Sequence, residues 1–271
     1  MNDLRYALRM IRKRPGGNLI VVATLALLIG TFSLALGVAN NSQSLWVPFP
    51  EPDQLVRVWR TSAERPGDTF PKDVFLELQK NCKSLESVGG IGGHQSRTVT
   101  GLGDPRRIGS MRVSANAINA SGLLPARGRI FSHEEERNAE TPPILLSDDA
   151  WQDLYQRSES IIGAQIVVDA IAHTIVGVMP GGANNNAMFY GMDVWLPANF
   201  DSPSSKEHWI GVVGRLKPGA TRRQLDAELA AIVPAAEESY AKKHKIDQPA
   251  ASASAHPIGK QFSATELDEE F

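Results

Sequence analysis

A run of twenty uncharged residues near the start of the chain constrains its fold more than any other feature. Residues 19–38 read LIVVATLALLIGTFSLALGV, and the most polar of them are Thr24, Thr31 and Ser33. At ~1.5 Å per residue, an α-helix of this length is about 30 Å long, which matches the hydrocarbon thickness of a bilayer. Because a helix in lipid satisfies its own backbone hydrogen bonds, we predict a transmembrane helix at 19–38. A buried core helix is the less favoured alternative, since every face is apolar.

The charges before this run predict its orientation. The first 18 residues contain one acidic residue, Asp3, and five basic residues, Arg5, Arg9, Arg12, Lys13 and Arg14. The positive-inside rule then places the N-terminus in the cytoplasm and everything after residue 38 outside it. Leu4, Leu8 and Ile11 share the helical face opposite the arginines. We therefore expect residues 1–18 to form a basic amphipathic helix at the membrane surface.

A cleaved secretory signal peptide is the main alternative to an anchor. Gly37, Val38 and Ala39 form a small-x-small triplet that resembles a cleavage site. However, the apolar run is longer than the usual hydrophobic region of about 7–15 residues. The basic region before it is also long and amphipathic. We favour an uncleaved anchor, and a secreted module that begins at Asn40 remains the alternative.

Composition excludes several classes of protein. The chain has 271 residues, a net charge of −2 and a single cysteine, Cys82. The net charge excludes a generally basic nucleic-acid binder, so no nucleic-acid partner is expected. One cysteine can form neither an intrachain disulfide nor a Cys-based zinc site. The length provides enough residues for a large hydrophobic core outside the membrane.

The remainder of the chain predicts one extracytoplasmic domain of class α+β. A proline-rich linker at 39–54 precedes a core domain at 55–245, and a polar acidic tail follows at 246–271. Alternating or continuous apolar runs predict strands at 55–59, 88–113 (two or three strands), 144–146, 166–168, 171–178, 194–196 and 210–216. Capping residues and apolar stripes predict helices at 71–81, 114–120, 149–156 and 221–242. We expect a mixed, mostly antiparallel sheet.

The six histidines form no recognisable site: His94, His133, His173, His208, His244 and His256. They are dispersed, and no H-E-x-x-H pattern occurs. His173 is expected on the face of a strand. Residues 133–136 (HEEE) are interpreted as a solvated acidic loop in preference to a cation site. A pairing of His208 with Asp201 in a catalytic triad has no specific support.

Two other features suggest chemistry but do not establish it. Residues 89–93 (GGIGG) lack the Gly-Lys-Ser/Thr ending of a P-loop and the spacing of a dinucleotide fingerprint, so turns or close packing explain them better. Cys82 lies among Lys80 and Lys83, which could lower its thiol pKa. A passive cysteine is the preferred interpretation. We therefore predict no catalytic, cofactor-binding or metal-binding residues, no cofactor, and no enzyme activity.

Several separated segments together resemble MacB/FtsX-type ABC transporter permeases, specifically the orphan permeases abundant in soil bacteria. The segments are 3–16 (DLRYALRMIRKRPG), 48–59 (PFPEPDQLVRVW), 112–116 (RVSAN), 173–180 (HTIVGVMP), 193–197 (DVWLP) and 213–221 (VGRLKPGAT). Each is weakly specific alone, but their number and order cover roughly residues 3–240. The resemblance implies a permease subunit of the bacterial inner membrane, in which the first membrane helix is followed by a non-catalytic periplasmic core domain. With its one apolar run at 19–38, this chain is expected to cross that membrane once.

The resemblance also implies partners. A separate cytoplasmic ABC ATPase would drive transport or efflux, and other permease subunits or copies of this chain would complete the membrane part. Family members continue into further transmembrane helices, whereas no second apolar run follows residue 38. We therefore expect a chain truncated before those helices, as in a fragment, a split permease or a degenerate paralogue. The alternative function is a membrane-tethered or secreted extracytoplasmic hydrolase or binding module.

Overall fold

The computed structural model describes most of the predicted outer domain and a short part of the predicted membrane segment. The described residues are 24–31, 33, 49–61, 67–101, 104–186, 188–202, 205, 208–246 and 251–258. The chain divides into two compact units, Met1–Trp46 and Val47–Phe271.

The described part of the first unit is helical. Residues 24–31 and 33 are helical and exposed, and the Thr31 hydroxyl lies 2.9 and 3.1 Å from the carbonyl oxygens of Leu27 and Leu28. This local back-bonding satisfies the hydroxyl within the helix. No helix among the described residues is both long enough and apolar enough to cross a membrane. The predicted helix at 1–18, the rest of the predicted span at 19–38 and linker residues 39–48 lie outside the described residues.

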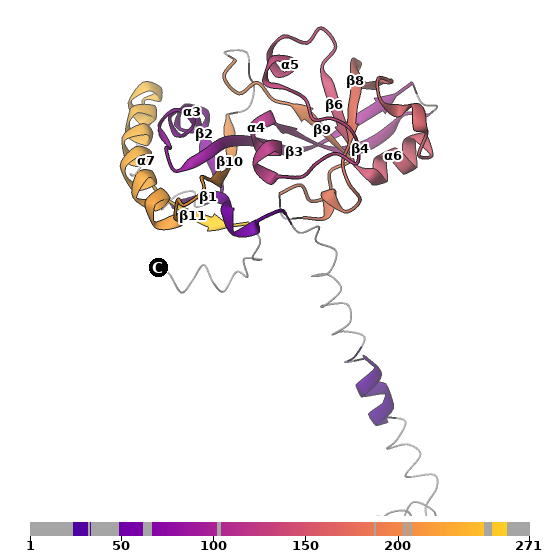
Figure 1. The fold of residues 1–271 in the computed structure, drawn as a ribbon, viewed down its shortest axis with the longest axis horizontal. Coiled ribbons are helices and arrows are strands. Elements are labelled where there is room, and N and C mark those ends of the chain that lie inside the picture. Colours follow the sequence, from indigo (N-terminus) through magenta and orange to yellow (C-terminus); the bar gives the residue numbers. More distant parts are fainter. Residues whose placement is uncertain are drawn as a thin grey trace, which may run out of the picture. The chain divides into compact units, whose positions relative to one another are not determined.

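The described residues of the second unit form one β-sheet with helices packed on it (Figure 1). Its strands are β1 (Leu55–Thr61), β2 (Thr69–Pro71), β3 (Leu85–Thr100), β4 (Arg106–Val113), β5 (Arg127–Gly128), β6 (Pro143–Leu146), β7 (Gln165–Val168), β8 (Ile171–Val178), β9 (Val194–Pro197), β10 (Trp209–Leu216) and β11 (Ser252–Pro257). Their order is β11-β1-β10-β3-β4-β9-β6-β8-β5, with β2 paired to β10 and β7 paired to β3 and β8.

The sheet is mixed and mostly antiparallel. Strand β4 runs parallel to β9, and β6 runs parallel to β8. The other pairs among the named strands are antiparallel. The predicted α+β class and sheet type are therefore confirmed for this unit.

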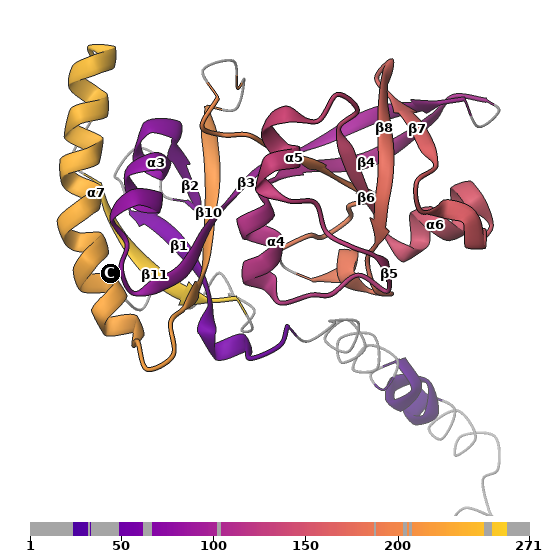
Figure 2. The ribbon, with the colours of Figure 1, turned by 45° about the horizontal axis from the view of Figure 1, so that its top comes forward.

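The helices divide between two halves of the sheet (Figure 2). They are α3 (Lys72–Asn81), α4 (Ala115–Ser121), α5 (His133–Asn138), α6 (Asp148–Tyr155) and α7 (Arg222–His244), with short 3-10 turns η1 (Pro52–Gln54), η2 (Glu159–Ile161) and η3 (Ala183–Asn185). Helices α3 and α7 share a core cluster with β1 and β10. Helix α6 contributes Trp151 to a second cluster with β6 and β8. Helix α4 belongs to a third cluster, together with Phe49 and Trp195.

The long strand β3 joins the two halves and explains the glycine-rich run. It pairs with β10 through its first part and with β4 through its second, with a register shift between Ile91 and His94. A Cβ added at Gly89 would lie 2.3 Å from the backbone of Ala117, and one at Gly90 would lie 2.6 Å from the Phe200 ring. Close packing, not turns, therefore accounts for these two glycines.

Local signals in the sequence place several element ends correctly. Ser114, Ser147 and Thr221 each accept a hydrogen bond from the backbone N–H three residues later, as N-caps do. The strands predicted at 166–168 and 171–178 are joined by a tight turn at Asp169 and Ala170, and both residues have positive φ angles, 48° and 64°. Two positive φ angles are typical of a tight type I′ turn between β7 and β8.

Two expectations about polar segments are wrong. Residues 252–257, assigned to the tail, form β11 and pair with β1 along its length, so the domain boundary at 245 is too early. The segment 133–136, expected to be a loop, begins helix α5, where Ser132 and Glu135 form a capping box. Acidic residues are favoured in the first turn of a helix because they face its positive dipole end.

Candidate functional site

The domain holds the chain firmly where it arrives from the linker, at residues 49–51, which we call the neck. Phe49 is buried, and Glu51 has a positive φ of 48°. Arg215 on β10 reaches across to this segment. Its Nη2 donates to the carbonyl oxygen of Pro50 at 3.0 Å, and its Nη1 lies 3.5 Å from that of Glu51. Its Nε donates to the carbonyl oxygen of Ala120 in α4 at 2.8 Å.

One guanidinium therefore connects the neck, a central strand and the C-terminal end of α4. The contact is tight on the side of Gly122, which has a φ of 69° and would place an added Cβ 3.3 Å from Pro50. The planar guanidinium can donate in several directions at once, which the single ammonium group of lysine cannot do with the same geometry. The neck is thus fixed to the middle of the sheet.

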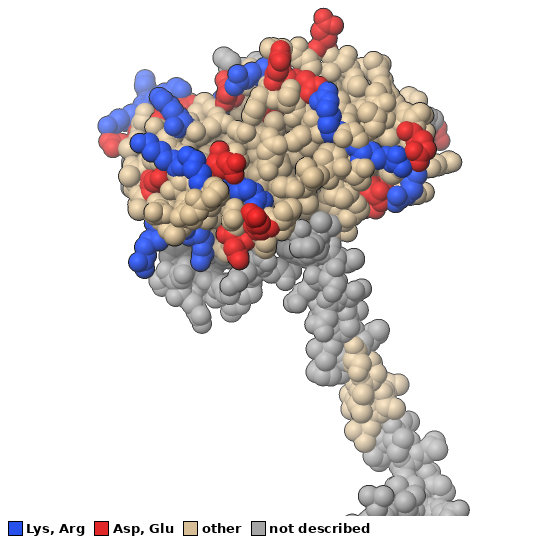
Figure 3. Space-filling model, in the orientation of Figure 1, with Lys and Arg blue, Asp and Glu red and all other residues tan. Residues whose placement is uncertain are grey.

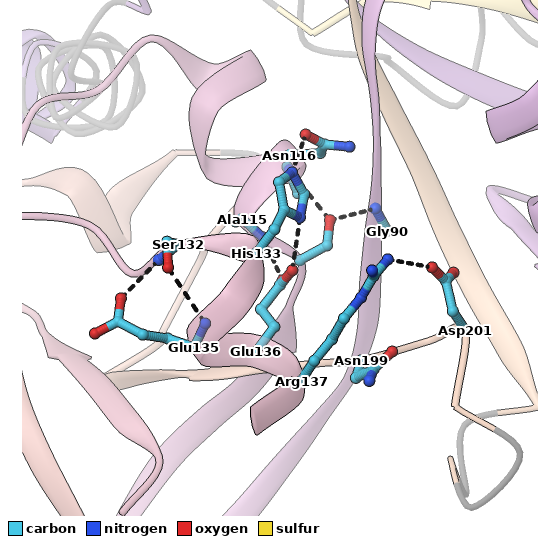
Figure 4. A network of polar contacts seen from close by, with 12 residues as sticks. Gly90, Ala115, Asn116, Ser132, His133, Glu135, Glu136, Arg137, Asn199 and Asp201 are labelled. Atoms are coloured by element: carbon cyan, nitrogen blue, oxygen red, sulfur yellow. Dashed lines mark hydrogen bonds and ion pairs between the residues drawn. The ribbon is translucent and has the colours of Figure 1, made fainter. Parts of the chain in front are cut away.

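A polar groove of about 380 Å³ opens between the two halves of the domain. Phe75 and Gln79 of α3 form one wall, and residues of α4, α5 and the segment 198–201 form the other. Figure 4 shows that Asn116, His133 and Glu136 of the second wall form one network, and that Arg137 and Asp201 form a separate pair.

The centre of this network is the pair His133 and Glu136 on α5. Glu136 accepts from the backbone N–H of Ala115, and its other oxygen lies 2.9 Å from Nδ1 of His133. Nε2 of His133 lies 2.8 Å from Oδ1 of Asn116, whose amide nitrogen donates to the carbonyl oxygen of Val88. Both ring nitrogens therefore face side-chain oxygen atoms.

Burial and hydrogen bonding act in opposite directions on the two neighbouring carboxyls of α5. Burial raises the pKa of Glu136, although Ala115 and His133 oppose this shift. The Arg129 guanidinium lowers the pKa of Glu135 to about 2, with help from Ser132. Nearby, Arg137 pairs with Asp201 at 3.0 Å across the mouth of the groove. The groove can hydrogen-bond a polar partner, but its charged groups already satisfy one another.

The structure places most of the histidines considered as candidates on separate elements. His173 lies on β8 as expected, buried, with a pKa lowered mainly by that burial. His256 contacts Ser254 on β11, and His244 lies 3.7 Å from Asp73. Among the six, His133 is the one that lines the groove.

The alternative considered for Cys82, a thiol pKa lowered by Lys80 and Lys83, is wrong in direction, and the preferred interpretation of a passive cysteine fits the structure. Burial raises the pKa of its thiol to about 12, and the negative charge of Glu228 adds to this effect. The Glu228 carboxylate accepts hydrogen bonds from the backbone N–H groups of Lys83 and Ser84. Its negative charge therefore acts on the thiol, where the positive charges of Lys80 and Lys83 were expected to lower the pKa. A thiol with so high a pKa is a poor nucleophile.

Sequence reasoning missed the contacts that tie distant segments together. Arg215 and Pro50 lie in two of the segments that resemble the permease family, 213–221 and 48–59. Nothing in either segment predicts that the two residues are in contact. Across the described residues, no group of three or more His, Cys, Asp or Glu side chains is arranged to hold a metal ion.

Comparison with known families decides the relationship of this chain. The profile of the MacB-like periplasmic core domain matches residues 19–232 of the 271. The chain belongs to this family. The resemblance inferred from separated segments is thereby confirmed. No curated protein matches the sequence significantly.

Solved structures of similar fold support the assignment of this MacB-like domain. A domain of a permease protein from Porphyromonas gingivalis matches with a TM-score of 0.56 and 16% identity, over 81% of this chain and 98% of that one. The periplasmic region of MacB from Actinobacillus actinomycetemcomitans gives 0.53 and 10%, over 80% and 92%. The extracellular domain of the noncanonic ABC-type transporter YknZ from Gram-positive bacteria gives 0.52 and 12%, over 74% and 99%.

Proposed function

We propose that this chain is the non-catalytic, membrane-anchored periplasmic domain of an ABC transporter permease. In this proposal the segment 19–38 crosses the inner membrane once, the N-terminus is cytoplasmic, and the domain is periplasmic. The chain works with a separate cytoplasmic ABC ATPase, and with other permease subunits or further copies of itself. Its role is to couple movement in the membrane to the outer domain, or to dock a partner there.

The observation that most supports this proposal is the set of hydrogen bonds by which Arg215 holds the neck. A domain that receives mechanical input from a membrane segment needs a stiff connection at the point where the chain arrives. Arg215 provides one because it binds Pro50, Glu51 and Ala120 together. The connection leads directly into β10, which pairs with β1, β2 and β3.

Affinity purification of the full chain from bacterial membranes in mild detergent tests this function. We expect an ABC ATPase, identified by mass spectrometry, or permease subunits to co-purify. Recovery of the chain as a free monomer in repeated preparations would contradict a permease role. The control is the same tag on a chain that lacks residues 1–38, which should not bring down the membrane partners.

Two further measurements separate the anchor from its alternatives. Intact-mass analysis of the membrane fraction should give a chain that retains residues 19–38, whereas a mature start at Asn40 would contradict the anchor. An assay against a panel of esters and peptides should give no hydrolysis. Activity that disappears on replacement of a histidine would favour the hydrolase alternative.

A further inference from the structure

Part of the long strand β3 is paired on one edge only. Figure 2 shows β3 continuing past β10 towards β7. Pairing with β10 ends at Ile91, which lies opposite Gly211, and pairing with β7 begins at Val99. Strand β4 pairs with the other edge of β3 from His94 to Val99. Between β10 and β7, therefore, no strand among the described residues pairs with this edge of β3.

The hydrogen bonds of Thr98 show which backbone groups face the open edge. Its N–H donates to Oδ1 of Asp169, and its carbonyl oxygen accepts from the N–H of Asp169, both at 2.9 Å. Successive residues of a strand direct these groups to opposite edges. The pairing with β4 from 94 to 99 has no register shift. The N–H and carbonyl groups of Ser96 and His94 therefore point to the same open edge as those of Thr98.

The open segment is short and accessible. Residues 93–96 are exposed in succession, and because alternate residues of a strand lie on opposite faces, both faces of β3 are accessible there. Six residues, 92–97, lie between the pairing with β10 at Ile91 and the contacts of Thr98. A strand of six residues spans about 20 Å. We call the open edge of residues 92–97 the β3 slot.

The strands on either side restrict what can occupy the β3 slot. Strand β3 of a second copy has 16 residues, so it would run into β10 at one end of the slot and into β7 at the other. A short extended segment that enters and leaves within the slot avoids both strands. Unpaired sheet edges accept such segments by strand addition, in which main-chain hydrogen bonds supply the affinity.

A basic side chain beside the β3 slot indicates the charge of the occupant. Arg107 on β4 is exposed and lies opposite Thr98. Its Nε donates to Oγ of Ser96 at 3.1 Å, so the side chain extends over β3 towards the slot. Within the described part of the chain, its guanidinium has no carboxylate partner. An acidic side chain on an added segment can therefore bind it bidentately.

The other charged groups near the slot already have partners or counter-charges. Arg97 pairs with Asp169 at 2.7 Å. Asp193 accepts from a backbone N–H of β4 at 2.7 Å. Exposed Asp104 and Arg106 have opposite charges and lie two positions apart, at the far end of the hairpin formed by β3 and β4. The guanidinium beside the slot is therefore the group most open to an acidic ligand.

We propose that the β3 slot binds an extended segment of a partner protein by strand addition, with an acidic side chain of that segment on Arg107. The inference rests on the docking role in the proposed function, because it names the surface and the kind of partner for that role. Figure 3 shows basic and acidic side chains next to one another over much of one face of the domain. Since no broad patch of one charge marks that face, main-chain pairing should dominate, and high salt should weaken binding only in part.

Peptide selection against the full chain in mild detergent tests this proposal. Random twelve-residue peptides displayed on phage are selected in parallel against the parent and Ser96→Pro. Proline removes the N–H that points into the slot but no hydrogen bond to β4, and edge positions tolerate it. Ser96→Ala is the matched control, because it also loses the hydroxyl and keeps the N–H.

We expect the parent and Ser96→Ala to enrich peptides that contain β-branched residues and at least one Asp or Glu. Fluorescence anisotropy should show at least tenfold weaker binding of these peptides to Ser96→Pro. Arg107→Glu should reverse the charge preference, so that a peptide with Lys in place of the acidic residue binds better. Bound peptide should slow hydrogen exchange at the amides of His94 and Ser96.

Methylation of alternate backbone nitrogens of the peptide blocks the same hydrogen bonds from the other side. It should abolish binding to the parent, and this result does not depend on whether Ser96→Pro folds. Failure of the parent to enrich any peptide would overturn the proposal. Selected peptides that bind despite methylation, and that leave exchange at positions 94 and 96 unchanged, would also overturn it.

The same preparations separate this inference from the proposed function. An ABC ATPase should co-purify with Ser96→Pro as it does with the parent, because the slot is expected to bind a different segment from the membrane contacts. Failure of the peptide tests with the ATPase still present would overturn the slot alone. Absence of both the ATPase and the peptide binding would contradict the proposed function as well.

Discussion

At the scale of single residues, a buried ion pair that no sequence pattern predicts connects β1 to α7. Arg60 on β1 binds Glu237 on α7 through two contacts, Nε to Oε1 at 2.6 Å and Nη2 to Oε2 at 3.1 Å. Both side chains are almost completely buried, and the guanidinium also lies 5.7 Å from the centre of the Trp209 ring. Such a pair fixes α7 against the sheet.

Removal of the Glu237 charge should strongly destabilise the domain. Glu237→Gln leaves the Arg60 charge buried without its counter-charge, which costs about 3 to 5 kcal/mol in comparable pairs. The double replacement Arg60→Met with Glu237→Leu should recover most of the loss. Urea unfolding followed by tryptophan fluorescence measures both. The exposed neighbour Glu238, changed to Gln, is the control and should leave the midpoint almost unchanged. A mild effect of Glu237→Gln would contradict the account.

The two adjacent carboxyls of α5 should respond to pH in opposite ways. The lowered pKa of Glu135 contributes stability that is present above its ordinary value of 4.5 and is lost as pH falls towards about 2. The raised pKa of Glu136 contributes stability that is present below 4.5 and is lost as pH rises. Glu135→Gln should therefore be less stable than the parent at neutral pH and converge with it near pH 2.

Glu136→Gln should show the reverse trend, and gain stability relative to the parent as pH rises from about 4.5. Melting temperatures of the parent and both variants across a pH series measure these differences. The two variants serve as controls for each other because they lie side by side on one short helix. A shift of the same sign and pH dependence in both would contradict the assignment.

At the scale of elements, the contact of β3 with α4 depends on the absence of a side chain. Gly89→Ala would place a methyl group 2.3 Å from the backbone of Ala117, so the helix or the strand must move. Overpacking of this kind costs about 1 to 3 kcal/mol, and more where backbone must shift. Gly93→Ala is the matched control, since an added Cβ there meets nothing within 4 Å. Thermal unfolding should separate the two variants clearly, and equal stability would contradict close packing at Gly89.

The neck should loosen when Arg215 is replaced. Arg215→Ala removes all three hydrogen bonds, to Pro50, Glu51 and Ala120. Arg215→Lys should keep only some of them, because an ammonium group lacks the geometry of the guanidinium. We expect faster hydrogen exchange in the neck and in α4, in the order parent, Lys, Ala. The exposed neighbour Lys217, changed to Ala, should behave as the parent. Unchanged exchange in the neck would show that Arg215 does not hold it.

Elements with local signals were predictable, and those without were not. Ser114, Ser147 and Thr221 cap helices because each can bond an N–H in the first turn, and that chemistry is visible in a short window. Strand β11 reads SASAHP, small and polar residues of low strand propensity, and exists because it pairs with β1. Its formation depends on tertiary context that a local pattern does not contain.

The long-range contacts of the domain, including those of the neck in the candidate site, were even less predictable. The pair Arg60 and Glu237 is separated by 177 positions, and Arg215 lies 165 positions from Pro50. Neither separation has a periodicity or spacing rule that could reveal it. The lysines near Cys82 in the sequence were misleading about its thiol pKa for the same reason. The pKa is raised in part by Glu228, which lies on α7, far away in the sequence.

At the scale of the whole molecule, the chain contains an apolar segment at 19–38, a neck held by Arg215 and a domain of the MacB-like periplasmic core family. The family assignment and the fold agree with the sequence resemblance. The proposed coupling role depends on the position of the domain on the outer side of the membrane.

Cysteine accessibility in spheroplasts tests that claim most directly. In a Cys82→Ser background, Ile171→Cys reports on the domain and Asn2→Cys reports on the N-terminus. We expect a membrane-impermeant maleimide to label position 171 in intact spheroplasts, and to label position 2 only after permeabilisation. Labelling of position 2 in intact spheroplasts, or of position 171 only after permeabilisation, would contradict it.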